Sequence, residues 1–200
     1  MKTLLVISDE HQNSLSEMQE ITSALRCDTL AGNIRKLDVL RAVRTGMYEC
    51  LWFVGHGENN TFVLNASETL NAEEIAQLAQ QCGAKHIMLN FCNSELMAYR
   101  IHYATGCDIV GVSSDVLTHE AMQLGALLAA RIAEWGDFVK GFESLGRIQD
   151  YILLTRNESI NSNEILLKIE EQEHEIKKIK LYIVLLLCMN LLSAAISLLS

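Results

Sequence analysis

The chain has 200 residues, half of them apolar, and a formal net charge of −9 at pH 7. Its length and apolar content allow one domain of ordinary size with a hydrophobic core, together with an appendage. The acidic balance, without a Lys/Arg cluster in the body of the chain, excludes nucleic acid as an expected partner.

Cysteine spacing argues against two further classes of protein. The six cysteines contain no CxxC pair and no densely spaced group. This usage is typical of a reducing compartment rather than of a disulfide scaffold or a zinc site. We therefore expect no metal and no cofactor.

The amino-terminal part alternates between strand and helix patterns. Residues 4–7 form an apolar run that is too short for a signal peptide and predicts a first buried strand. Ser14 and Glu17 have the spacing of a capping box, and the apolar positions after them predict a helix up to residue 25. The next expected elements are a strand over 27–31, a turn at 32–33 and a helix over 34–45.

Two short apolar runs in the middle of the chain, rich in branched or aromatic residues, predict buried parallel strands over 50–54 and 86–90. His56, between two glycines, follows the first run, and Cys92 follows the second. In an open parallel sheet, chemistry collects beyond the carboxyl ends of the strands. His56 and Cys92 are therefore expected to face each other across one crevice.

A cysteine and a histidine in this arrangement are the parts of a cysteine hydrolase. A neighbouring imidazole converts a thiol to the nucleophilic thiolate, which predicts Cys92 as the nucleophile and His56 as the base. The backbone amides of Gly57 and Cys92 are expected to form the oxyanion hole. The alternative is an ordinary loop histidine beside a buried thiol.

The rest of the domain continues the alternation of strands and helices. The expected elements are a hairpin arm over 61–64, a helix over 71–81, a helix over 94–105, a strand over 108–113, and helices over 118–135 and 138–154. This order predicts an α/β fold with a mainly parallel sheet covered on both faces.

Four segments resemble the CHAT branch of the caspase-like cysteine peptidases, the clan that also contains separase. They are LWFVGHGE (51–58), LNAEEIAQL (70–78), IMLNFCNS (87–94) and GVSSDV (111–116). The resemblance covers residues 3 to 154 and implies a caspase-like three-layer sandwich over 1–154 that cleaves protein or peptide substrates. The family often has a small residue before the cysteine and an acidic residue after it, where this chain has Phe91 and Asn93.

Asp115 is the predicted substrate-binding residue. It follows the strand after the Cys92 strand, so it is expected to border the same crevice. An acidic residue in a similar segment of separase lines the pocket for a basic side chain, so the resemblance implies cleavage after Arg or Lys. The alternative is that Asp115 caps the helix that follows.

The composition changes after residue 154. Residues 155–163 are polar and predict a linker. Residues 164–180 carry heptad spacing, which predicts either a short coiled coil that pairs two copies as a homodimer or an amphipathic spacer helix. Residues 181–200 lack any charged residue and, at about 1.5 Å per residue, match the roughly 30 Å of a bilayer core. They predict a transmembrane tail anchor, and the lysines before it keep the catalytic domain in the cytoplasm.

The sequence thus predicts a membrane-anchored cysteine endopeptidase. The main alternative is a tail-anchored interaction module that keeps a caspase-like fold with little or no proteolysis. A doubly wound domain that binds a small molecule is less favoured, because no GxGxxG phosphate loop follows the first strand.

Overall fold

The computed structural model describes residues 1–8, 12–58 and 60–156, and beyond them Lys177, Lys178, Tyr182 and Leu186. The chain divides into two units, Met1–Ser159 and Ile160–Ser200, and nearly all described residues belong to the first. The predicted heptad helix and membrane span therefore lie almost entirely outside the described residues. None of the helices that the structure describes has the length and the apolar content that crossing a bilayer requires.

A six-stranded sheet forms the centre of the first unit, in the order β2-β1-β3-β7-β8-β9. The first five strands in this order run parallel, and β9 is antiparallel to β8. The predicted α/β class with a mainly parallel sheet is confirmed. The strands are β1 (Lys2–Ile7), β2 (Arg26–Ala31), β3 (Cys50–Val54), β7 (His86–Asn90), β8 (Asp108–Val112) and β9 (Tyr151–Leu154).

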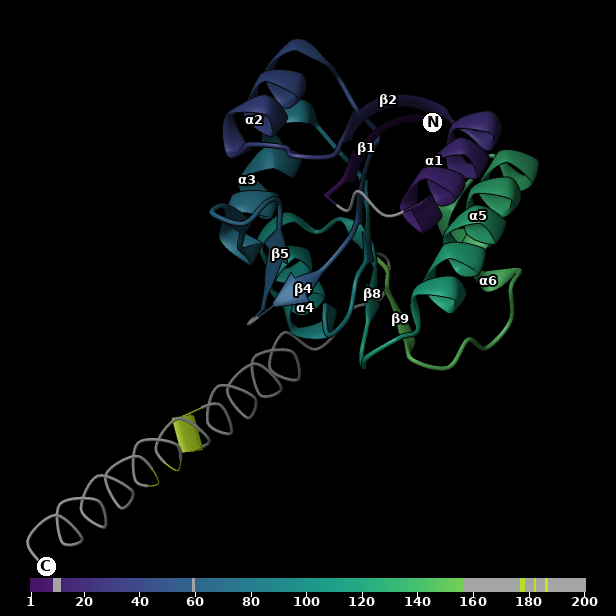
Figure 1. Cartoon of the computed structure of the whole chain (residues 1–200). Coiled ribbons are helices and arrows are strands. Elements are labelled where there is room, and N and C mark those ends of the chain that lie inside the picture. Colours follow the sequence, from purple (N-terminus) through teal and green to yellow (C-terminus); the bar gives the residue numbers. More distant parts are fainter. Residues whose placement is uncertain (9–11, 59, 157–176, 179–181, 183–185, 187–200) are drawn as a thin grey trace, which may run out of the picture. The chain divides into compact units, whose positions relative to one another are not determined.

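Helices cover both faces of the sheet and complete three layers. The helices α1 (Gln12–Ala24), α5 (Thr118–Trp135) and α6 (Phe138–Glu143) lie on one side (Figure 1). The helices α2 (Lys36–Thr45), α3 (Ala72–Cys82) and α4 (Glu95–Thr105) lie on the other (Figure 1).

The two helical layers explain why the central strands are apolar at every position. Successive side chains of a strand point to opposite faces, and here both faces are buried. Trp52 of β3 packs into the cluster that contains Ile21 of α1 and Leu128 of α5. Its neighbours Leu51 and Phe53 are also fully buried. A continuous apolar run is therefore the pattern that this sheet requires.

A second, smaller sheet lies beside the carboxyl end of β3. It contains β4 (Gly57–Glu58), β5 (Thr61–Val63) and β6 (Thr69–Leu70), in that order and antiparallel. The buried Phe62 of β5 has its ring centroid 5.3 Å from that of Phe53 and 5.1 Å from that of Phe91. The small sheet thereby fixes the segment that follows β3 against the residue that precedes Cys92.

The predicted helix over 138–154 is wrong in its second half. The helix α6 begins at Phe138, where the side chain of Asp137 accepts a hydrogen bond from the Lys140 amide, and ends at Glu143. Gly146 and Asp150 then have positive φ angles, 75° and 65°, and the chain turns into β9. Pairing of β9 with β8 satisfies backbone groups that a longer helix would leave unpaired at the edge of the sheet.

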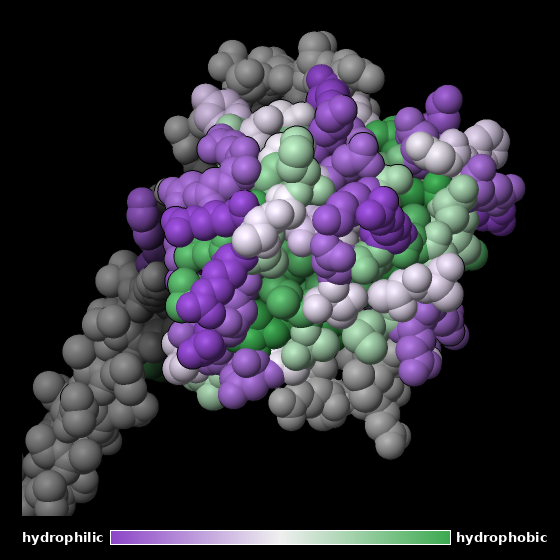
Figure 2. Space-filling view, turned by 90° about the horizontal axis from the view of Figure 1, so that it is seen from above, coloured by the Kyte–Doolittle hydropathy of each residue, from purple (hydrophilic) through white to green (hydrophobic). Residues whose placement is uncertain are grey.

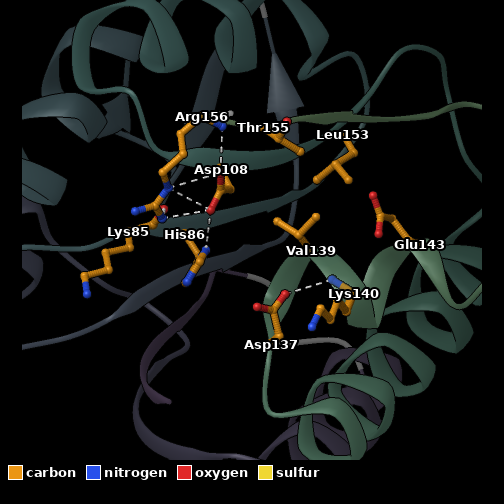
Figure 3. Close-up of a pocket in the computed structure, with 10 residues that line it drawn as sticks. All are labelled: Lys85, His86, Asp108, Asp137, Val139, Lys140, Glu143, Leu153, Thr155 and Arg156. Atoms are coloured by element: carbon orange, nitrogen blue, oxygen red, sulfur yellow. Dashed lines mark hydrogen bonds and ion pairs between the residues drawn. The ribbon is translucent and has the colours of Figure 1, made fainter. Parts of the chain in front are cut away.

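Arg156 binds the Asp108 side chain at the amino ends of β7 and β8 (Figure 3). Asp108, which is 4% exposed, accepts hydrogen bonds from the Arg156 backbone amide at 2.8 Å and from its Nη2 atom at 2.8 Å. Nδ1 of His86 lies 3.0 Å from the same carboxyl. Burial alone would raise the pKa of Asp108, but the hydrogen bonds from His86 and Arg156 hold it well below its usual range. The predicted linker over 155–163 is therefore wrong at Arg156, which is part of the fold.

The surface of the first unit mixes hydrophilic and apolar residues. One face shows apolar areas between prominent hydrophilic side chains (Figure 2). Single exposed apolar residues of this kind are normal on protein surfaces and by themselves indicate no partner. The large ones in the described part of this unit are Leu37, Met47, Tyr103, Leu117, Leu127 and Trp135.

Candidate active site

His56 and Cys92 line the same pocket, which has a volume of about 260 Å³. The pocket lies at the carboxyl ends of β3 and β7, where Val54 pairs with Asn90. His56 stands two residues after Val54, and Cys92 stands two residues after Asn90. The parallel register therefore brings the two side chains to the same level of the sheet.

The glycines around His56 allow the backbone to approach its neighbours closely. A Cβ atom at Gly57 would collide with the carbonyl oxygen of Cys92, so this position requires glycine. Gly55 has a φ angle of 153°, and a Cβ atom there would collide with the Ser8 hydroxyl. The Gly57 backbone thus lies against the Cys92 backbone, while its role in an oxyanion hole stays a prediction.

Cys92 lies on a tight turn between β7 and α4. Asn93 has a φ angle of 55°, and its backbone amide donates to the Ser114 carbonyl at 3.1 Å. The fully buried Ser94 donates from Oγ to the Leu89 carbonyl at 3.0 Å and accepts from the Val112 amide at 2.8 Å. These bonds fasten the turn to the ends of β7 and β8. Ser94 carries no signal of this role in the sequence, since a serine before a helix is usually a local cap.

The thiol of Cys92 is half-buried and has a partner of its own. Its Sγ atom lies 3.6 Å from the carbonyl oxygen of Val116, a geometry in which the S–H group donates a weak hydrogen bond. Val116 also lines the pocket. The segment after β8 therefore forms one wall of the pocket.

The side chain of Asp115, which was predicted to border the Cys92 crevice, is hydrogen-bonded to Asn93. Its Oδ1 atom accepts a hydrogen bond from Nδ2 of Asn93 at 2.6 Å, and it is not among the described residues that line the pocket. The helix α5 begins at Thr118 with Leu117 as its N-cap residue, so the alternative that Asp115 is the helix cap is wrong. A role of Asp115 in binding substrate stays a prediction.

An unpredicted acid, Glu17 of α1, lines the pocket. The capping-box assignment is wrong, because α1 already begins at Gln12 and Ser14 lies inside it. Glu17 is 2% exposed, and its Oε1 atom accepts a hydrogen bond from Nδ2 of Asn90 at 2.7 Å. Burial raises the pKa of Glu17 to about 7. The available signal was its spacing: Glu17 stands four residues before the core residue Ile21, hence on the same side of the helix.

Comparisons with known proteins add no assignment. No protein-family model matches the chain, and no curated protein matches its sequence. Within the described residues, no group of three or more His, Cys, Asp or Glu side chains is placed to hold a metal ion. The site is therefore interpreted from its own geometry.

Proposed function

We propose that the chain is a cysteine endopeptidase that cleaves protein substrates with Cys92 as nucleophile and His56 as base. The observation that carries this proposal is that both side chains line one pocket at the ends of two adjacent parallel strands. A base beside a thiol is the requirement for forming a nucleophilic thiolate near neutral pH. The resemblance to CHAT peptidases supports a peptide bond as the target.

The proposed reaction has two steps. The Cys92 thiolate attacks the scissile carbonyl, and the amides of Gly57 and Cys92 donate to the oxyanion that forms. His56, which has taken the thiol proton, gives it to the leaving amine, and a thioester to Cys92 remains. His56 then activates a water molecule, which hydrolyses the thioester and releases the new carboxylate with the free thiol.

A peptide that lies across the carboxyl ends of β3 and β7 would need to insert only one side chain into the pocket of about 260 Å³.

We expect cleavage after Arg, and less efficiently after Lys. A carboxyl group in a partly desolvated slot binds a guanidinium in two-pronged geometry and repels Asp and Glu. A fluorogenic peptide library that varies the residue before the cut bond measures this preference. Cleavage after Asp would contradict it, and an unchanged Arg preference in Asp115→Ala would exclude Asp115 as the residue that binds the substrate side chain.

We further propose that residues 181–200 insert into a membrane, with the α/β unit on the cytoplasmic side. About 20 uncharged residues suffice to cross the hydrocarbon core. Deleting 181–200 should release the protein from the membrane fraction without loss of its thermal unfolding transition. A matched control replaces the segment by an unrelated apolar span, which should restore membrane association. A truncated protein that unfolds would instead assign the segment to the core.

A further inference from the structure

The pocket that holds Cys92 contains a buried acid from a different part of the chain. Glu17 comes from α1, which packs against α5 beside the carboxyl end of the sheet. Its carboxyl group lies against Gly125 of α5, where a Cβ atom would collide with Oε1. The helix α5 therefore has glycine at the point where this carboxyl needs space.

A hydrogen-bonded network holds Glu17 in this position. The Tyr151 hydroxyl donates to Oδ1 of Asn90 at 3.0 Å, which fixes the orientation of the Asn90 amide. Nδ2 of Asn90 then donates to Glu17 at 2.7 Å and to the Ala121 carbonyl at 3.0 Å. Asn90 is the last residue of β7, two positions before Cys92. The buried acid is thus built onto the same strand end as the candidate nucleophile.

We infer that Glu17 is the specificity residue of this pocket and recognises a cationic side chain, Arg or Lys, of the substrate. The inference rests on the proposed peptidase function. Of the two candidate acids, Glu17 lines the pocket, whereas Asp115 binds Asn93 and does not. None of the described residues that line the pocket is Lys or Arg. A cation of the substrate would therefore supply the counter-charge that a buried carboxylate requires.

Recognition of a cation by Glu17 should depend on pH. Burial raises the pKa of Glu17 to about 7, so its ionised fraction changes most around neutrality. Since kcat/KM reports ionisation of the free enzyme, the preference for a cation should rise roughly tenfold from about pH 6 to about pH 8.

Other ionisable groups face the same region. They are Glu20 on α1, Glu120 on α5, Tyr151 on β9, and His56 and Cys92 across the pocket. Ionisation of His56 and Cys92 affects the cleavage chemistry of charged and neutral substrates alike. The ratio of two kcat/KM values, one for each substrate, removes this common effect.

The test compares two peptides that differ only before the cut bond, one with arginine and one with its neutral isostere citrulline. In the full chain, the arginine-to-citrulline ratio of kcat/KM should rise roughly tenfold between about pH 6 and about pH 8. Glu17→Gln should lower the ratio roughly tenfold or more at pH 8 and remove its pH dependence. Glu73→Gln is the matched control, because Glu73 is exposed on α3 and does not line the Cys92 pocket. It should keep both the ratio and its rise.

Labelling of Cys92 by an electrophilic probe distinguishes a failure of the inference about Glu17 from a failure of the proposed peptidase function. If Glu17→Gln is labelled and cleaves both peptides with the wild-type ratio, the inference about Glu17 is wrong and the peptidase function stands. If the wild-type protein neither labels at Cys92 nor cleaves either peptide, the proposed function fails and the inference fails with it. Gly125→Ala adds a Cβ atom that would displace the Glu17 carboxyl. This variant should therefore also lose the preference for arginine over citrulline.

Discussion

Cys92→Ala should abolish labelling of the full chain by an electrophilic peptide probe, and His56→Ala should lower the labelling rate roughly a hundredfold or more. The first variant removes the attacking sulfur atom. The second removes the only proposed base in the pocket that both residues line. The measurement is the rate of covalent probe incorporation, with the site of attachment identified by mass spectrometry.

Cys27 provides the matched control for this experiment. Both thiols are half-buried, so access alone does not distinguish them. Burial raises the pKa of Cys27 to about 11, which suppresses its thiolate near neutral pH. The Cys27→Ala protein should therefore be labelled by the probe at the wild-type rate. Equal labelling of wild type and Cys92→Ala, with both proteins folded, would reject the peptidase and favour an interaction module.

Asp108→Asn should lower the free energy of unfolding by about 3 kcal/mol near neutral pH. The substitution removes the buried charge that Arg156 and His86 contact. We take the lower end of the range for broken buried pairs, because the Arg156 side chain is 39% exposed and its charge can be solvated. Denaturant unfolding of the two proteins measures this difference.

The loss should also depend on pH in a defined direction. The pKa of Asp108 is lower in the folded than in the unfolded state, so its charge stabilises the fold above the unfolded pKa. The difference between wild type and Asp108→Asn should therefore shrink as the pH falls below about 4. Glu134→Gln is the control, because both side chains of the Arg131–Glu134 pair are exposed and the pair should contribute about 1 kcal/mol or less. A difference that stays constant down to acid pH would contradict the role of the Asp108 charge.

The sequence predicts well those strands whose burial on both faces leaves a continuous apolar run in the sequence. The strands over 50–54 and 86–90 are found with the predicted bounds, because burial on both faces requires an unbroken apolar run. The strand β9 was missed for the opposite reason. Ile148 and Ile152 fit the spacing of a helix, and only the unpaired edge of β8 selects a strand for the second of them.

The candidate site is predictable to a similar extent. The sequence predicts that His56 and Cys92 meet at one pocket because each stands two residues after a recognisable strand. The spacing of Glu17 from Ile21 places it on the buried side of its helix, but the partner that explains its burial, Asn90, lies 73 residues later in the chain. A capping pattern with Ser14 offered a sufficient local explanation. A buried polar residue is explained by its hydrogen-bond partner, and a single sequence does not show which distant residue that partner is.

The short strand β9 links two places that lie far apart on the sheet. Tyr151, its first residue, contacts Asn90 beside the Cys92 pocket, whereas Arg156, just after its end, is held at Asp108. These two places lie at opposite ends of strands of five residues, about 13 Å apart at roughly 3.3 Å per residue. A mechanical pull on the chain beyond Arg156 would be borne first by the Asp108 ion pairs and then by the β8–β9 ladder. Such a pull would therefore reach Tyr151, which contacts Asn90 of the pocket, only after the Asp108–Arg156 contacts have broken.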